Sequence, residues 1–419
     1  MGSDWRIMSL REAHVELIDC DHRTPPPAPT GYPYISIPDL RDGRIDVSRA
    51  RRITAEHFRE WTRRAKPQAH DVILSRRTNP GVTASVPSDL KFALGQNLVL
   101  LRTDGSVVDP RFLRWLVRGP DWWAQIQRHL NVGAVFDSLK CADIPDFRLR
   151  IPPLSEQRRI AELLTALDDK IDLNRRTCET LESMARAVFK SWFIDFDPVR
   201  AKAAGRDPGL PSHVADMFPD SFEDSELGEI PAGWRQGRLG DVLKQRIERC
   251  EPSADTESRP YVPIECISSG TLALGDARPG EDAKSSLIKF ARSDLLFGAM
   301  RPYFHKVCIA PFDGTTRTTV FVLRPRRDGD FAFGTLWLHR RETIDYATQH
   351  STGSTIPYAV WRGSLEDMLG VLPPPMVRDA FDVVARPLLG QLQEPYFQNK
   401  ALTATRDTLL PALLSGTPE

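Results

Sequence analysis

Two short polar segments contain residue types that proteins use to contact DNA. Arg76, Arg77 and Asn79 follow a predicted strand, VILS, and arginine and asparagine can each form paired hydrogen bonds with the edge of guanine or adenine in the major groove. The same side chains also bind backbone phosphates. The pattern predicts groove or phosphate contact, with a solvated surface as the alternative for each single residue. A second segment follows the matching predicted strand, DLLFGAM, and contains Arg301, His305 and Lys306.

These segments lie in basic regions that the overall charge conceals. The chain has 56 basic and 56 acidic residues, yet residues 41–80 hold eleven Arg or Lys against five Asp or Glu, a net charge of +6. Residues 284–341 hold eleven against four, a net of +7. Paired basic regions favour a polyanionic partner such as DNA. The candidate DNA-contacting residues are Arg41, Arg44, Arg76, Arg77, Asn79, Arg301, His305, Lys306 and Arg317.

Motifs for catalysis are missing from the sequence. No two glycines are spaced as G-x-G, and there is no Asn-Pro-Pro-aromatic motif for methylating a flipped adenine and no phosphate-binding G-x-x-x-x-G-K-[ST] loop. Asp146 with Asp168-x-Lys170 superficially resembles a nuclease motif, but Asp168 and Lys170 are expected on the solvated face of a long helix. Tyr303 and Phe304 are expected to pack in a core. The sequence therefore predicts a binding protein with no catalytic site and no metal site.

The elements that must position these segments include a long helix with coiled-coil spacing. The helix is predicted over residues 155–192, with Ser155 as N-cap after two prolines. Its apolar seam alternates four-residue and three-residue steps, which is the coiled-coil pattern. The seam residues are Ile160, Leu164, Leu167, Ile171, Asn174, Cys178, Leu181, Ala185, Val188 and Trp192.

The same spacing of seam residues recurs 221 residues later in a weaker form. Interior prolines break helices, so Pro387 and Pro395 predict a bent or interrupted second helix. The two helices are expected to pair antiparallel. The second seam contains Phe381, Ala385, Leu388, Leu392, Pro395, Asn399, Leu402, Arg406, Leu409 and Leu413.

Segments that precede the two helices also echo each other, which predicts an internal duplication with pseudo-two-fold symmetry. Short β-branched runs bounded by turn residues alternate with helical stretches in both, so the expected fold class is α+β. The predicted parts are a first domain (1–150), a central helix (151–195), an acidic Pro/Gly-rich connector (196–232), a second domain (233–374) and a distal helix (375–419).

Composition excludes several other classes. There is no run of about 18 apolar residues to span a bilayer and no apolar leader, so a cytoplasmic location is expected. The six cysteines are scattered without zinc-ligand spacing, which favours reduced structural thiols.

Four motifs resemble the specificity subunits of type I restriction-modification systems: IPPLSEQRRIAELL, SELGEIPAGW, SDLLFGAMRPYFHKVCIAPFDG and RDTLLPALLSG. The resemblance implies two target-recognition domains, held apart by the helices, that read an asymmetric bipartite site in double-stranded DNA. It also implies that methylation subunits, two of them in the expected complex, and restriction subunits dock on the chain. S-adenosylmethionine, ATP and magnesium would belong to those partners.

Two other functional classes remain open on sequence alone. A stand-alone DNA-binding regulator would usually dimerise to read a palindrome, whereas this chain holds two unlike domains. A coiled-coil scaffold with no DNA partner would have no need for two matched basic regions. Neighbouring methyltransferase and helicase-nuclease genes would discriminate between these classes.

Overall fold

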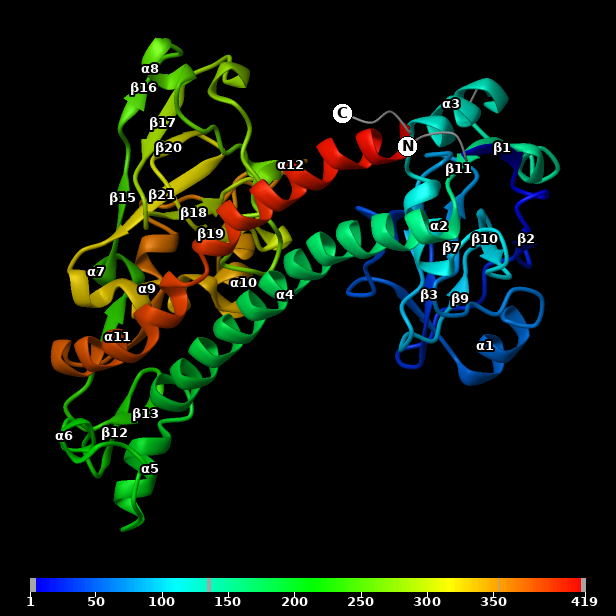
Figure 1. Ribbon diagram of the computed structural model, residues 1–419. Coiled ribbons are helices and arrows are strands. Elements are labelled where there is room, and N and C mark those ends of the chain that lie inside the picture. The colour runs from blue at the N-terminus through cyan, green and yellow to red at the C-terminus, as the bar shows by residue number, and fades with distance from the viewer. Residues whose placement is uncertain (1–4, 134–136, 354, 416–419) are drawn as a thin grey trace. The chain divides into compact units, whose positions relative to one another are not determined.

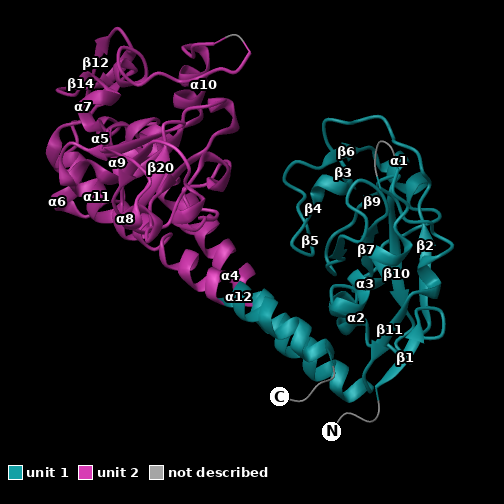
Figure 2. Cartoon of the chain, turned by 90° about the horizontal axis from the view of Figure 1, so that it is seen from above, with its two compact units in different colours: residues 1–169, 402–419 teal, residues 170–401 magenta. Residues whose placement is uncertain are grey.

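The computed structural model describes residues 5–133, 137–353 and 355–415 (Figure 1). The final residue of the RDTLLPALLSG motif, Gly416, lies outside them. The chain divides into two compact units, coloured separately in Figure 2. Unit 1 comprises Met1–Asp169 and Leu402–Glu419, and unit 2 comprises Lys170–Ala401. Within the described residues, no helix combines the length and apolar character needed to cross a membrane.

Unit 1 is built on a four-stranded antiparallel sheet. Its strand order is β2 (Val15–Asp19), β10 (Leu98–Thr103), β7 (Val72–Ser75) and β8 (Thr83–Ser85). Successive side chains of a strand point to opposite faces, and β7 accordingly sends Val72 and Leu74 into one apolar cluster and Ile73 into another. Helices α2 (Pro110–Leu116) and α3 (Pro120–His129) cover the first face with the buried Trp115 and Trp122.

Smaller elements complete unit 1. Strand β3 (Tyr32–Ile35) lies between β6 (Arg51–Ile53) and β9 (Ala93–Leu94), next to helix α1 (Ala55–Trp61). A short hairpin joins β4 (Leu40–Arg41) to β5 (Arg44–Ile45). Strand β1 (Arg6–Ser9) pairs antiparallel with β11 (Arg148–Ile151), so the start and end of this part of the chain meet.

Unit 2 repeats the same sheet topology. Its four strands follow the order β15 (Leu243–Arg246), β21 (Val320–Pro325), β18 (Leu295–Gly298) and β19 (Val307–Ile309). Helices α9 (Phe331–His339) and α10 (Arg341–Gln349) occupy the chain positions of α2 and α3. Strand β14 (Arg235–Arg238) pairs with β22 (Leu369–Leu372) as β1 pairs with β11. The accessory sheet differs, with the order β16 (Arg249–Cys250), β17 (Leu287–Phe290) and β20 (Gly314–Arg317). The mixed α and β content agrees with the predicted fold class.

The long helices follow the predicted apolar phase. Helix α4 spans Leu154–Phe193, and all ten residues of its predicted seam are buried or half-buried. The second helix is interrupted, as predicted: α11 ends at Gly390 (Pro375–Gly390) and α12 begins at Glu394 (Glu394–Ser415). Pro395 lies in the first turn of α12, where a missing N–H costs nothing. All ten residues of the second seam are buried or half-buried as well.

Asp168 corrects the expectation of a solvated helix face. Its carboxylate is buried, with only 1% of the residue exposed. It accepts hydrogen bonds from Arg114 of α2 and from Nη1 of Arg406 of α12, the latter at 2.8 Å. A buried carboxylate needs such partners to offset its lost hydration. Asp168 therefore connects α4, α12 and the sheet-bearing part of unit 1.

The segment predicted as a connector, 196–232, is folded. It contains helices α5 (Asp197–Ala203) and α6 (Ser212–Ala215) and a hairpin of β12 (Phe222–Ser225) and β13 (Gly228–Pro231). Val199 and Phe218 are buried in the largest apolar cluster of unit 2 together with Trp192 of α4. The segment thus adds to the core instead of serving as a loose linker.

Candidate nucleic-acid interface

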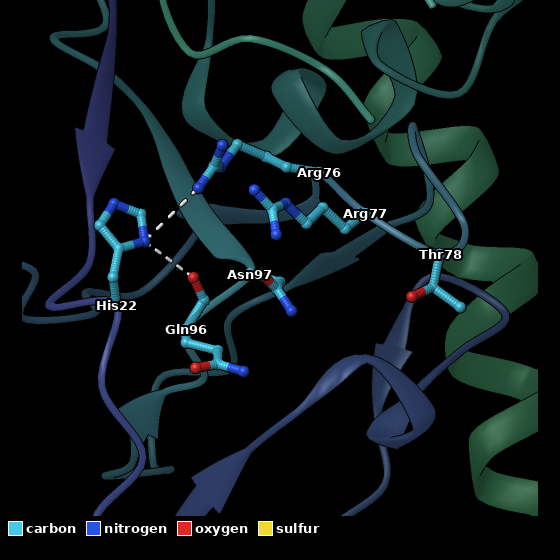
Figure 3. Close-up of a pocket in the computed structure, with 6 residues that line it drawn as sticks. All are labelled: His22, Arg76, Arg77, Thr78, Gln96 and Asn97. Carbon is cyan, nitrogen blue, oxygen red and sulfur yellow. Dashed lines mark hydrogen bonds between the residues drawn. The ribbon is translucent and has the colours of Figure 1, made fainter. Parts of the chain in front are cut away.

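Polar side chains surround a hollow of about 530 Å³ next to the ends of β7 and β10 in the unit 1 sheet (Figure 3). Arg76 and Arg77 come from the turn after β7, where the sequence predicted DNA contacts. Thr78 comes from the same turn, and the other lining residues, His22, Gln96 and Asn97, come from other parts of the chain. A neighbouring hollow of about 520 Å³ shares Gln96 and Asn97 and adds the predicted residue Asn79.

Backbone hydrogen bonds fix this arrangement. The N–H of Arg76 donates to the carbonyl of Asn97 at 3.0 Å, which joins the turn after β7 to the turn before β10. Thr78 adopts a left-handed conformation with φ of 65°, which reverses the chain between β7 and β8. The side chains of Arg77 and Gln96 are exposed, and Asn97 is half-buried. The hollow therefore presents guanidinium and amide groups from two turns that a backbone hydrogen bond joins.

The guanidinium of Arg76 lies between two other segments of unit 1. One of its Nη atoms lies 3.5 Å from the carbonyl oxygen of Leu139, and the other lies 3.5 Å from Nδ1 of His22. Figure 3 shows the approach of the Arg76 guanidinium to His22. Arg76 is half-buried and Arg77 is exposed, so Arg77 is the more accessible guanidinium at the hollow.

Among the described residues, Asp19, Cys20 and His22 are grouped closely enough to resemble a set of metal ligands. Their ligand atoms lie within 4.8 Å of one another. Each already has a partner: the Cys20 thiol donates to the carbonyl of Gly95, and the two ring nitrogens of His22 face the carbonyl of Gln96 and the carboxylate of Asp19. Burial raises the pKa of the Cys20 thiol, which opposes the thiolate that a metal requires. The group therefore works as a hydrogen-bond network that orients His22.

Two predicted residues of unit 1 lie away from the hollow. Arg41, in the β4–β5 hairpin, is exposed and lies 3.5 Å from the carboxylate of Asp46. Arg44 is directed to helix α4, where its Nη2 donates to the backbone carbonyl of Asp168 at 2.7 Å. Neither residue lines the hollow with Arg76 and Arg77.

Three of the four predicted residues of unit 2, Arg301, His305 and Lys306, lie in the turn between β18 and β19. Arg301 is exposed, and both it and His305 adopt left-handed conformations with φ of 52°. Nε2 of His305 lies 2.9 Å from the carbonyl oxygen of His339, and Nζ of Lys306 donates to the carbonyl of Ile264 at 2.7 Å. Arg317 is exposed at the end of β20. Of these side chains, Arg301 and Arg317 are the more accessible.

Tyr303 and Phe304 correct another expectation, because they are not core residues. Their exposed fractions are 42% and 40%, and their rings contact each other at 4.8 Å between centroids. The buried residue of this turn is Pro302. The turn therefore displays two aromatic rings beside Arg301.

Behind this turn, His339 is buried next to Glu182 and Arg186 of α4. Nε2 of His339 lies 3.7 Å from the Glu182 carboxylate, which alone would favour a protonated ring. Burial, His305 and the Arg186 guanidinium outweigh that attraction and hold the pKa of His339 well below its usual range. Burial also lowers the pKa of His305. His339 is therefore neutral in the folded protein near pH 7.

Unit 2 is expected to lose stability as the pH falls below about 6.5. An unfolded histidine, with an ordinary pKa of about 6.5, takes up a proton that folded His339 does not bind, so acid favours the unfolded state by at most about 2 kcal/mol at pH 5. Denaturant unfolding at pH 7 and pH 5 should show that the free energy of unfolding falls less between these pH values in His339→Gln than in wild type. His213→Gln, which changes an exposed histidine, is the control. An equal loss in wild type and His339→Gln would contradict this assignment.

Sequence reasoning missed His22, Gln96 and Asn97 as members of the unit 1 site. The signal for the amides was present, because Gln96 and Asn97 interrupt the apolar run FALGQNLVLL and follow Gly95 in a turn. Nothing near His22 in the sequence marks it, since the fold alone brings it to Arg76.

Comparisons with known proteins find similar proteins of one kind. Residues 26–183 match the type I restriction modification DNA specificity domain. The chain is 26% identical, over 92% of its length and 86% of the relative's, to the type I restriction enzyme MjaIX specificity subunit of Methanocaldococcus jannaschii. It is 32% identical, over 39% of its length and 34% of the relative's, to the HindI specificity subunit of Haemophilus influenzae. The crystal structure of the type I restriction-modification S subunit from M. genitalium has a similar fold, with a TM-score of 0.57 at 13% identity, covering 99% of this chain and 96% of that one. The relatives that this chain matches by sequence and by fold are specificity subunits of type I restriction-modification systems.

Proposed function

We propose that this chain recognises an asymmetric, bipartite sequence in double-stranded DNA, with one recognition domain for each half. The observation that carries the proposal is the repetition of one sheet topology, β2-β10-β7-β8 and β15-β21-β18-β19, with basic side chains after the third strand of each. Phosphate contacts would hold the domains on the duplex, and contacts with base edges would select the sequence. Residues 1–150 and 233–374 are the proposed target-recognition domains.

The helices are the proposed spacer between the two domains. In unit 1, Asp168 of α4 contacts Arg406 of α12, and in unit 2, Asn174 of α4 donates to Asn399 of α12 at 2.9 Å. From Asp168 to Asn174 the residue number rises along α4, while the contacted residue number falls along α12. This order supports antiparallel pairing. We propose that α4 forms one antiparallel coiled coil with α11 and α12.

Docking of methylation and restriction subunits is part of the same proposal. Helices α4 and α11 carry large exposed apolar side chains outside their seams, and we propose that these side chains contribute to the docking surfaces. Catalysis would belong to the docked subunits, together with S-adenosylmethionine, ATP and magnesium. The exposed apolar residues are Leu163, Leu173, Met184, Met376, Val383 and Val384.

The test is methyl transfer and DNA binding with and without partners. The purified chain alone is expected to transfer no methyl groups, whereas its complex with the methylation subunits should methylate DNA at one sequence. The readout is tritium transfer from S-adenosylmethionine to DNA. A complex of the methylation subunits with a specificity subunit of known, different target is the control. Transfer by the chain alone, or an unchanged target when the two specificity subunits are exchanged, would contradict the proposal.

A further inference from the structure

The two units share one set of backbone positions around the candidate site, and hydrogen bonds establish the correspondence. The N–H of Arg76 donates to the carbonyl of Asn97 at 3.0 Å, and the N–H of Ala299 donates to that of Thr319 at 2.9 Å. Each bond joins the end of the third strand to the turn before the second strand of its sheet. Arg76 therefore corresponds to Ala299, and Asn97 corresponds to Thr319.

A second pair of contacts confirms this register. The N–H of Leu139 donates to the carbonyl of Arg76 at 2.9 Å, as the N–H of Ala359 does to that of Ala299 at 2.8 Å. The next residues, Arg77 and Met300, each form an isolated β-bridge, with Ser138 and Tyr358 respectively. Thr78 and Arg301, one position further, both have a positive φ. The remaining corresponding pair, by chain position, is Gln96 and Thr318.

The side chains at these shared positions differ in chemistry. Unit 1 places Arg77 and Gln96, both exposed, where unit 2 places the half-buried Met300 and the exposed Thr318. Glutamine pairs with the N6 and N7 atoms of adenine, arginine pairs with O6 and N7 of guanine, and a threonine methyl group contacts the thymine methyl group. Unit 2 has its guanidinium one position later, at Arg301. The same scaffold thus offers two different sets of base contacts.

We infer that these corresponding positions determine sequence specificity, with Gln96 selecting an adenine and Arg77 a guanine in one half-site, and Thr318 selecting a thymine in the other. The inference rests on the proposed DNA-reading function and adds which residues read which bases. Gln96 and Arg77 meet the same hollow from two turns that a backbone hydrogen bond holds together, so both can reach neighbouring base pairs. Arg76 positions this pair of turns through its backbone, whose N–H donates to Asn97 and whose carbonyl accepts from Leu139.

The experiment uses the full chain in complex with its methylation subunits and selects binding sites from a randomised duplex library. Gln96→Ala should lower discrimination at one adenine position of a single half-site by about tenfold. Arg77→Ala should do the same at a guanine of that half, and Thr318→Ala at a thymine of the other half. Gln127→Ala, which removes an exposed glutamine of α3 outside the hollow, should leave the selected sequence unchanged. Thermal unfolding should be unaltered in all four variants.

The outcomes separate this inference from the function on which it rests. If the wild-type complex selects no sequence, DNA recognition itself is wrong. If wild type selects a bipartite site but Gln96→Ala, correctly folded, weakens no adenine position, the assignment is overturned. Effects of Gln96→Ala and Thr318→Ala on the same half-site would overturn the proposed correspondence between the units.

Discussion

Replacement of Asp168 by alanine is expected to destabilise unit 1 by about 3–5 kcal/mol, the cost of removing one partner from a buried ion pair. The variant would leave Arg114 and Arg406 without the carboxylate that they share. Arg406 would keep Asp407, and Arg44 would keep its bond to the Asp168 backbone carbonyl. The site is already crowded with positive charge, since burial and the nearby Arg406 lower the pKa of Arg118 to about 10.

Denaturant unfolding of the whole chain, followed by probes in each unit, would measure this effect. Asp169→Ala is the matched control, because Asp169 is the next residue of α4 and is exposed. Asp168→Asn should lose nearly as much free energy of unfolding as Asp168→Ala. The amide keeps the size of the side chain, but it lacks the negative charge that the arginines need. A loss below 1 kcal/mol in Asp168→Ala would mean that the arginines do not depend on this carboxylate.

Exchange of residues 233–374 for the second recognition domain of another family member is expected to replace one half of the DNA target completely and leave the other half intact. The physical reason is that β14 and β22 pair at the base of the domain, with Arg235 opposite Leu372, so both junctions lie next to each other. The donor domain must keep aromatic contacts like that of Trp234 with Phe193 of α4, whose ring centroids are 6.1 Å apart.

Sequencing of the methylated sites would report the result of this exchange. A graft of the chain's own residues 233–374 through the same engineered junctions is the control for the junctions. The reciprocal exchange of residues 1–150 should change the opposite half. A chimera in which both halves change, or neither, would show that the domains do not read DNA independently.

The apolar periodicity predicted most of what local sequence can determine. The alternation of four-residue and three-residue steps located the buried side of α4, from Ile160 to Trp192, because helix geometry alone decides which residues share a face. Pro395 predicted the break before α12 for an equally local reason, whereas Pro387 lies inside α11 without ending it.

What the sequence could not predict depends on contacts between distant segments. Asp168 flanks the seam, and its burial depends on hydrogen bonds from Arg114 and Arg406, which come from elsewhere in unit 1. The segment 196–232 lacks periodicity, yet Phe218 is buried against Trp192 because a core needs volume and not a repeating pattern. The candidate site has the same origin, since His22 meets Arg76 only in the folded sheet.

The most direct test of the central claim is single-molecule sequencing of methylated bases in cells that express this chain with its methylation subunits. The expected result is one asymmetric motif made of two specified blocks at a fixed separation, which disappears when this chain is deleted. A palindromic motif, a single continuous block, or a motif that persists without this chain would contradict recognition by two unlike domains on one scaffold.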